Sequence, residues 1–235
     1  MQALYLQDCY QREFASIVTK AEGRFTILEK TLFYPNSGGQ PHDLGKMIDE
    51  EGNEYNVLFV KKINGEISHE LDKEIAVGKK IKGIIDWQRR YFFMRNHTAA
   101  HVLSAVIHGE AGAEITGNQL GEQSRIDFSL ENLDKDKIKS YEQKANEIIE
   151  QALPVETKFM LRSEAEKIPV VFKLAKGFPP EIKELRIVEI AGFDVQACGG
   201  THVKNTKEIG KIEIIKTENK GKSNRRIYFR IIPSQ

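Results

Sequence analysis

Hydrophobic and polar residues alternate along four short segments in the first third of the chain: 14–19, 24–29, 55–60 and 81–85. A period of two is typical of strands that bury one face. Turn sequences with glycine separate the segments, and no long helical repeat lies between them. Short strands at this spacing predict a small β-barrel in residues 1–85.

The hydrophobic period changes after this region. Asp86 is suited to cap a first helical segment, and Asn96 to cap a second helix over residues 97–108. A repeat at three and four residues predicts a longer helix at about 134–153. Extended segments are predicted at 115–128, 155–160, 185–190, 209–216 and 226–232, and a short helix at 163–167. This mixture predicts a second domain over residues 86–235, so the whole chain belongs to the α+β class.

Composition narrows the classes of protein. The chain has 235 residues, of which 40% are hydrophobic, so it can bury a sizeable core. A formal net charge of +1 does not by itself point to nucleic acid, so any basic surface has to be local. Two cysteines make a disulfide framework improbable. No apolar run is long enough to cross a membrane, and the N-terminus has no leader pattern, so we expect a cytoplasmic protein with no membrane partner.

Four metal-ligand side chains occur as two pairs with the same spacing. His97 and His101 share one face if their segment is helical, and Cys198 and His202 flank two glycines that allow a tight backbone path. One thiolate and three imidazoles suit zinc better than magnesium or calcium, which need oxygen ligands. Copper, nickel and cobalt are also compatible with these donors. We therefore predict one Zn²⁺ per chain.

The spacing leaves the role of this metal open. A site closed by four permanent ligands is structural, whereas a loose ligand or a fifth position admits a water or a carbonyl oxygen. Protease chemistry of the His-Glu-x-x-His type is excluded, because Thr98 follows His97 where those enzymes carry the glutamate base. Asp194 lies just before Cys198, and is either a group that orients a ligand or a turn residue.

A loop over residues 33–45 contains glycines, prolines and polar side chains at a density that excludes regular structure. Its centre is Gly38, Gly39 and Gln40. The loop is either a tight connection between strands or a place where a backbone without Cβ atoms approaches a ligand.

The combination of motifs resembles the editing domain of alanyl-tRNA synthetases and their free-standing relatives, the AlaX proteins. The resemblance covers nearly the whole length and includes residues 33–45, 86–97, 125–128, 198–203 and 225–227. The synthetases carry an aminoacylation domain ahead of this region, and the longest AlaX forms carry a further C-terminal domain. We therefore expect the medium-length form of the family, with a barrel subdomain followed by a zinc-bearing editing subdomain.

The resemblance implies hydrolysis, in trans, of the ester that joins serine, or glycine, to the terminal adenosine of alanine-specific tRNA. It also implies that the four ligands hold zinc and that Gly38, Gly39 and Gln40 border the aminoacyl pocket. Thr116 is at the position where the family places a hydroxyl that senses the seryl hydroxyl, with Gln119 as its companion. A pocket that hydrogen-bonds this hydroxyl rejects alanine, because alanine leaves the buried partner unpaired.

The tRNA also has to be held. Residues 216–226 contain five cations and one acid around a glycine turn. This segment is either a solvated loop or a phosphate contact made by Lys220, Lys222, Arg225 and Arg226. Two alternatives to the editing hydrolase remain: a non-catalytic tRNA-binding module with structural zinc, and an editing hydrolase of the threonyl-tRNA synthetase type. The glycine-rich loop favours the alanine system.

Overall fold

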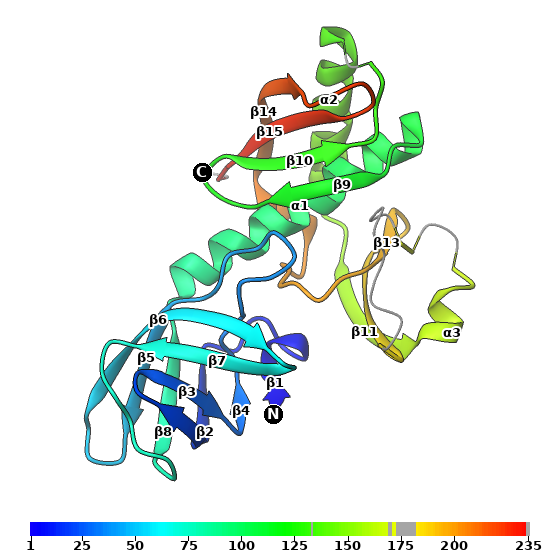
Figure 1. Ribbon diagram of the computed structural model, residues 1–235. Helices are drawn as coiled ribbons and strands as arrows, with labels where there is room; N and C mark the ends of the chain where they lie inside the picture. The colour runs from blue at the N-terminus through cyan, green and yellow to red at the C-terminus, as the bar shows by residue number, and fades with distance from the viewer. Residues whose placement is uncertain (133, 169–170, 173–181, 234–235) are drawn as a thin grey trace. The chain divides into compact units, whose positions relative to one another are not determined.

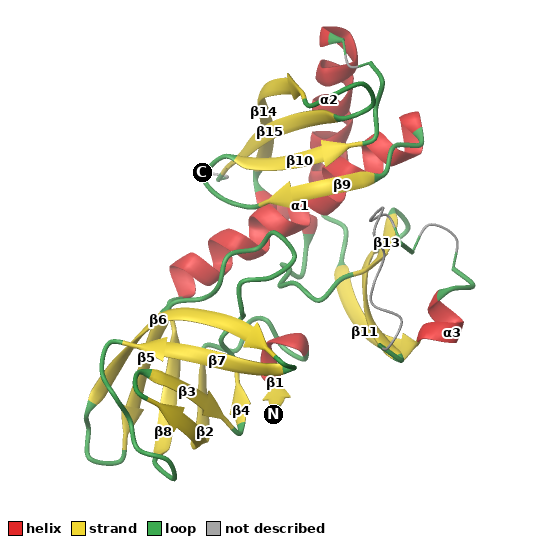
Figure 2. Cartoon of the chain, in the orientation of Figure 1, coloured by secondary structure: helices red, strands yellow, loops and turns green. Residues whose placement is uncertain are grey.

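The computed structural model describes residues 1–132, 134–168, 171–172 and 182–233. Figure 1 shows the chain from the N-terminus to the C-terminus, and Figure 2 shows its helices and strands. The chain divides into two compact units, Met1–Phe93 and Met94–Gln235, which are considered separately below. In the described ranges, no helix is long and apolar enough to span a membrane. The expected combination of a β-barrel with further sheets and a few helices is confirmed.

The first unit contains a closed barrel of six antiparallel strands in the order β2-β3-β7-β6-β5-β8. The barrel strands are β2 (Glu13–Glu22), β3 (Phe25–Leu28), β5 (Gly45–Asp49), β6 (Glu54–Ile63), β7 (Glu66–Leu71) and β8 (Lys80–Ile85). Outside the barrel, the short strands β1 (Gln2–Ala3) and β4 (Lys30–Thr31) pair in parallel, and a 3-10 turn covers Leu4–Leu6. The four alternating segments of the sequence all lie in these barrel strands.

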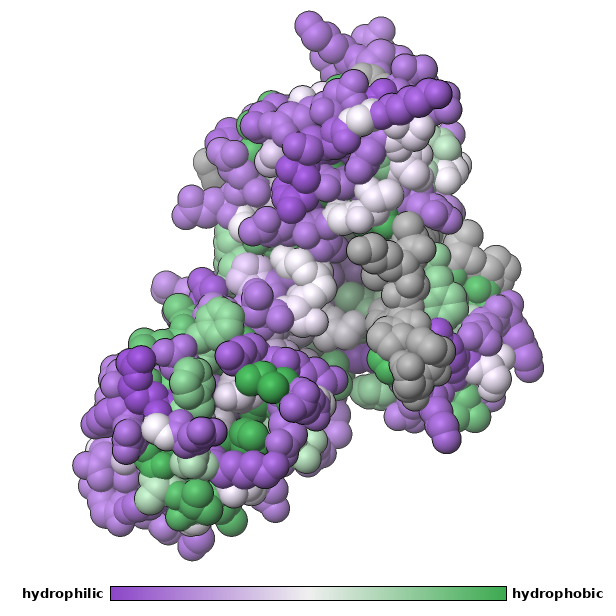
Figure 3. All heavy atoms as spheres, in the orientation of Figure 1, coloured by the Kyte–Doolittle hydropathy of each residue, from purple (hydrophilic) through white to green (hydrophobic). Residues whose placement is uncertain are grey.

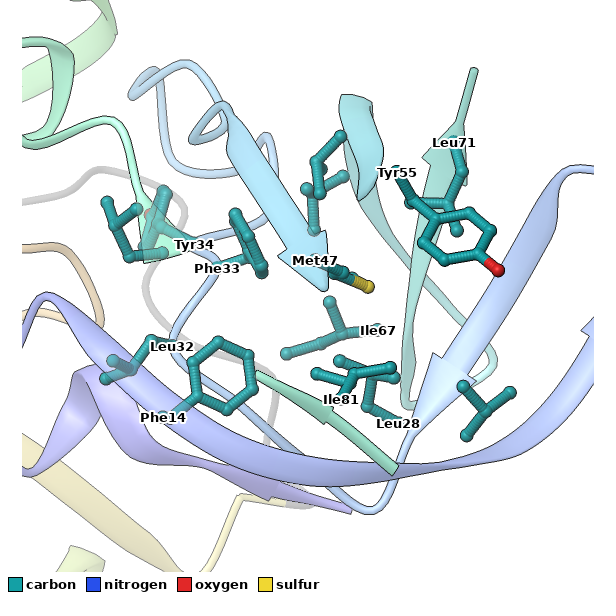
Figure 4. Close-up of a cluster of buried hydrophobic side chains, with 14 of the residues drawn as sticks. Phe14, Leu28, Leu32, Phe33, Tyr34, Met47, Tyr55, Ile67, Leu71 and Ile81 are labelled. Carbon is teal, nitrogen blue, oxygen red and sulfur yellow. The ribbon is translucent and has the colours of Figure 1, made fainter. Parts of the chain in front are cut away.

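The barrel core is filled by the inward positions of the alternating strands. Figure 4 shows Phe14, Leu28, Met47 and Ile67 pointing toward one another from four different strands. Burial of each such side chain contributes about 1.5–3 kcal/mol. Gly83 makes room for the largest of them, because a Cβ atom there would lie 2.2 Å from the Phe14 ring. On the face that Figure 3 shows, most of the surface is hydrophilic, with hydrophobic residues exposed among the hydrophilic ones.

A buried ion pair holds the ends of the glycine-rich loop within the first unit. Arg90 donates to the carboxylate of Asp43 and to the carbonyl oxygens of Cys9 at 3.1 Å and Leu32 at 2.6 Å. Asp43 in turn accepts from the backbone N–H of Tyr34 at 2.6 Å. Because both charges are fully buried, loss of either partner would leave the other uncompensated, at a cost of about 3–5 kcal/mol.

Helix α1 (Trp87–Ala111) is continuous, so the predicted break into two helices at Asn96 is wrong. The Asn96 side chain is fully buried, and its Oδ1 accepts a hydrogen bond of 2.9 Å from the Ser124 hydroxyl. An asparagine in a helix interior usually competes with the helix through local backbone hydrogen bonds. Here Ser124, from a neighbouring strand, bonds the amide oxygen of Asn96, and the helix continues past this residue.

The second unit contains a four-stranded antiparallel sheet in the order β14-β15-β10-β9. Helix α2 (Lys135–Glu150) begins after Asp134, whose carboxylate caps the Lys137 N–H at 2.8 Å, and confirms the predicted long helix. The Asn146 amide bonds both the N–H and the carbonyl of Ile212, so α2 covers the edge strand β14. The four strands are β9 (Ile115–Gln119), β10 (Ser124–Phe128), β14 (Lys211–Asn219) and β15 (Arg225–Ile232).

A second sheet of this unit has three antiparallel strands in the order β11-β12-β13. One of its faces packs Leu185, Ile187 and Ala197 into an apolar cluster with Ala165 and Val171. The elements around it are β11 (Val155–Leu161), the short helix α3 (Arg162–Ala165), β12 (Glu184–Ile190) and β13 (Asp194–Ala197). A 3-10 turn at Thr206–Ile209 contacts α2. The opposite face carries polar side chains that belong to the site described next.

Candidate metal centre

Four side chains of the second unit converge on one point. Helix α1 supplies His97 and His101, one turn apart, and the loop after β13 supplies Cys198 and His202. Their ligand atoms all lie within 4.8 Å of one another. The structure therefore brings together the four residues that spacing alone predicted as ligands.

The geometry of this cluster fits a tetrahedral ion. Cys198 Sγ lies 3.5 Å from His97 Nε2 and 3.4 Å from His202 Nε2. Zinc bonds of about 2.0–2.3 Å in a tetrahedron separate sulfur from nitrogen by about 3.5 Å. The Gly200 N–H points to the sulfur at 3.4 Å, an arrangement that stabilises a thiolate. The donor set and its spacing therefore match zinc.

Burial keeps two of the three imidazoles, those of His97 and His202, in the form that binds metal. Desolvation, reinforced by the Arg186 charge, lowers the pKa of His97 to about 3. Desolvation also lowers the pKa of His202 well below its usual value, and the neighbouring His97, His101 and Arg186 lower it further. Neutral imidazoles keep a lone pair for a ligand bond at neutral pH.

The Thr98 hydroxyl fixes the proton on one of these rings. It lies 3.0 Å from the carbonyl oxygen of Met94, 3.2 Å from the backbone N–H of Val203 and 3.2 Å from His202 Nδ1. The carbonyl can only accept and the amide can only donate, and the hydroxyl has a single proton. All three bonds form together only when Thr98 donates to Met94 and accepts a proton from His202 Nδ1. His202 Nε2, which faces Cys198, then holds the lone pair.

Asp194 lies beside a second ligand. Its carboxylate Oδ2 is 3.8 Å from His101 Nδ1, and both side chains are buried. Ligating histidines commonly present their second nitrogen to a carboxylate, which sets the orientation of the ring and raises its basicity. This position agrees with the ligand-orienting role that the sequence offered for Asp194, and the role itself stays a prediction.

Sequence reasoning missed Arg186 on strand β12. Its Nη1 donates to the carbonyl oxygens of Cys198 at 3.0 Å and Gly200 at 2.8 Å, and its own carbonyl accepts from the Cys198 N–H at 2.9 Å. The guanidinium thus fixes the loop between the two C-terminal ligands. A signal was available, because a single charge stands between Leu185 and Ile187 in a buried hydrophobic strand.

The predicted substrate residues lie on strand β9. The exposed Thr116 hydroxyl donates to Asn224 Oδ1 at 3.1 Å. Gln119 is also exposed and pairs with Arg125 in the β9–β10 register. Thr116 is the extra residue of a β-bulge, because Gly117 pairs with Asp127 and Ile115 pairs with Phe128. Strand alternation therefore does not relate its direction to that of Gln119, and each is a separate candidate. Their roles toward substrate stay predictions.

The basic segment divides into two pairs of residues. Arg226 makes two bonds to Asp127, at 2.7 and 2.8 Å, and Arg225 donates to the carbonyl oxygens of Gly221 and Glu131. These guanidiniums stabilise the β14–β15 hairpin. By contrast, Lys220 and Lys222 are exposed at the turn of the hairpin. The lysines are therefore the better candidates for contact with phosphate.

The glycine-rich loop of the first unit forms a tight reverse turn. Ser37 and Gln40 exchange two backbone hydrogen bonds, of 3.1 and 2.9 Å, around Gly38 and Gly39. Both glycines have positive φ, 57° and 81°, a combination that two-residue turns of this kind require and that other residues seldom adopt. The glycines thus have a conformational cause. Their predicted contribution to substrate binding stays a prediction.

Two family models match parts of the chain. One, described as the second additional domain of threonyl and alanyl tRNA synthetases, matches residues 185–228, which include Cys198 and His202. The other, described as class II (A) tRNA synthetases, matches residues 2–89.

Several relatives match over nearly the full length. The alanyl-tRNA editing protein AlaX-M of Methanosarcina barkeri is 56% identical over 240 residues, which cover 98% of this chain and 99% of the relative. The AlaX-M protein of Saccharolobus solfataricus is 46% identical over 234 residues and 98% of each chain. An alanine-tRNA ligase of Ignicoccus hospitalis is 37% identical over 222 residues, which cover 91% of this chain and 24% of that protein.

Proposed function

The chain belongs to the AlaX-M family of alanyl-tRNA editing proteins, and on this premise we propose that it hydrolyses the ester joining serine, or glycine, to alanine-specific tRNA. The reaction is a zinc-dependent deacylation in trans. The observation that carries the proposal is the convergence of three imidazoles and one thiol within 4.8 Å. This donor set suits a metal that acts on an oxygen of the substrate.

His97, His101, Cys198 and His202 would hold one zinc ion per chain. When bound, the ion would supply Lewis acidity, which either polarises an ester carbonyl or lowers the pKa of a water molecule. All four side chains are at least half-buried, so the site excludes much of the bulk solvent. A low local dielectric strengthens every charge interaction with the reacting ester.

Three further residues keep the ligands in position. Thr98 accepts the proton on His202 Nδ1, and the Asp194 carboxylate faces His101 Nδ1 at 3.8 Å. These contacts orient the two rings and keep their other nitrogens toward the metal. Arg186 holds the intervening loop through two carbonyl oxygens. All three act through the ligands and need no contact with the substrate.

Selection of serine over alanine requires a group that detects the seryl hydroxyl. The Thr116 hydroxyl donates its proton to Asn224 Oδ1. The lone pairs of the Thr116 oxygen can therefore accept a hydrogen bond from the seryl hydroxyl. An alanyl ester cannot make this bond. Because Thr116 is exposed, the difference is that of an ordinary hydrogen bond, about 0.5–1.5 kcal/mol, or roughly 2- to 13-fold in rate.

Binding of the tRNA requires a local cationic surface. Lys220 and Lys222 supply it in this proposal, because they are exposed, while Arg225 and Arg226 stabilise the hairpin that carries them. A contact of this kind positions the RNA backbone without reading its sequence.

Two purified seryl-tRNAs test the proposal. The released serine is measured with tRNA for alanine and with tRNA for threonine at equal concentrations. Faster hydrolysis of the alanine-specific substrate supports the proposal. A preference for the threonine-specific substrate would instead assign the chain to the threonyl type, which the matched synthetase domain also includes. Binding of either tRNA without turnover would indicate a non-catalytic module.

A further inference from the structure

Gln196 on strand β13 is a buried amide with an unusual environment. The residue is only 4% exposed, and its Oε1 has no hydrogen-bond partner among the residues that the structure describes. Nearly all buried polar atoms in folded proteins have a partner, because an unpaired one loses its water without compensation. An exception therefore requires an explanation, and a ligand absent from the free protein is one.

The register of the sheet places this amide on the side of the metal centre. Gln196 pairs with Val188, and strand alternation puts its side chain on the same face as Arg186 and Asp194. Asp194 reaches His101 from this face, and Arg186 reaches the carbonyl oxygen of Cys198. The unpartnered oxygen is therefore flanked by two side chains that both touch the ligand cluster.

The opposite face of the same strands carries residues whose role is packing alone. There, Ile187 and Ala197 pack into an apolar cluster with Leu185 and Val171. A hydrophobic residue at position 196 would fill its space beside Val188 without an unpaired oxygen. Packing alone thus gives no reason for an amide at Gln196.

We propose that Oε1 of Gln196 accepts a hydrogen bond from an N–H or O–H group on the aminoacyl end of the substrate. The inference rests on the proposed function, because it requires an aminoacyl adenosine at the metal centre. The seryl hydroxyl, the α-ammonium group and a ribose hydroxyl are donors, whereas the ester carbonyl is not. A neutral amide provides an acceptor beside Asp194 without adding a second negative charge.

A hydrogen bond formed only in the complex has two consequences that a structural hydrogen bond lacks. Replacement of Gln196 by the similarly shaped methionine removes the acceptor. The variant should bind the aminoacyl end about tenfold more weakly, because the donor of the substrate then loses its partner. The free protein should keep or raise its melting temperature, because an unsatisfied buried group has been removed.

The experiment compares the wild-type protein with Gln196→Met in the zinc-loaded full chain. Affinity is measured by calorimetry for two non-hydrolysable probes, the 3′-serylamino and 3′-alanylamino derivatives of 3′-deoxyadenosine. Melting temperature and zinc content are measured on the same samples. Gln143→Met is the matched control, because Gln143 is an exposed residue of α2 that pairs with Glu147.

The expected result is weaker probe binding by Gln196→Met with unchanged zinc content and no fall in melting temperature. A loss confined to the seryl probe identifies the side-chain hydroxyl as the donor, and a loss shared by both probes identifies the ammonium or a ribose hydroxyl. Equal affinity of variant and wild type overturns the inference, as does a melting temperature that falls with the affinity. If the wild type releases no serine from seryl-tRNA, the proposed function fails instead.

Discussion

Thr98→Val tests how the metal ligands are held in place. The substitution keeps the branched shape of the side chain and removes the hydroxyl that contacts Met94, His202 and Val203. Met94 loses only an additional donor to its carbonyl. The buried N–H groups of His202 and Val203, in contrast, lose their acceptor.

The size of the loss in stability follows from these two donors that have lost their acceptor. Each buried donor without a partner costs about 1–3 kcal/mol, so the metal-free variant should be less stable by at least that amount. Loss of a hydrogen-bond partner of a ligating histidine typically weakens metal binding about 10- to 100-fold. That range equals about 1.4–2.7 kcal/mol of binding free energy. We expect the zinc dissociation constant of Thr98→Val to rise within it.

Competition with a chromogenic zinc chelator at pH 7 measures the effect. Ser104→Ala is the matched control, because the Ser104 hydroxyl is buried in the same helix and donates to the Ala100 carbonyl at 2.6 Å, as Thr98 does to Met94. The control should bind zinc like the wild type, and Thr98→Ser should restore most of the affinity. Equal zinc affinity in Thr98→Val and Ser104→Ala would refute the argument about His202.

Three further predictions concern other parts of the molecule. Thr116→Val should reduce the rate ratio for seryl over alanyl esters at least about twofold with zinc content unchanged. An unaltered ratio, measured by deacylation of both esters, would mean that another group detects the seryl hydroxyl. Reversal of charge at Lys220 and Lys222 should weaken tRNA binding. It should also reduce the slope of log binding constant against log salt concentration by about 0.7–0.9 per lost phosphate contact, measured by filter binding over a salt series. Binding equal to that of the wild type would show that this hairpin does not contact the tRNA. In the barrel, burial lowers the pKa of His69 to about 4. Because its unfolded-state pKa is about 6.5, the stability from neutral His69 is fully present above pH 6.5 and falls by about 3 kcal/mol as the pH drops to 4. Urea unfolding of wild type and His69→Gln at both pH values isolates this loss, and a parallel response of the two proteins would contradict it.

The metal ligands were predictable because the information is local. Two histidines four residues apart share a helix face, and the glycines between Cys198 and His202 allow a tight loop, so sequence spacing alone indicates the cluster. The partners of these ligands depend on tertiary contacts. Arg186 contacts the loop between Cys198 and His202 from a strand whose facing side could be known only after the β12–β13 register was fixed.

The fold was also predictable only where the signal is local in the sequence. Alternation identified four of the six barrel strands, β2, β3, β6 and β8, since each of them buries one face. It did not identify β5 or β7, and β7 buries three successive residues, Ile67, Ser68 and His69. The break predicted at Asn96 failed because the residue type favours a cap in an isolated helix. Its hydrogen bond to Ser124 links positions 28 residues apart, and no local rule contains that contact.

The central claim is that zinc held by His97, His101, Cys198 and His202 is required for deacylation. The most direct measurement is the rate at which serine is released from alanine-specific tRNA that carries serine. Three samples are compared: the zinc-loaded protein, the protein stripped of metal with a chelator, and the stripped protein after zinc is returned. Metal content is measured in each sample. We predict that the rate is lost on stripping and recovered with one zinc per chain. A stripped protein that contains no metal and still releases serine at the original rate would contradict the claim.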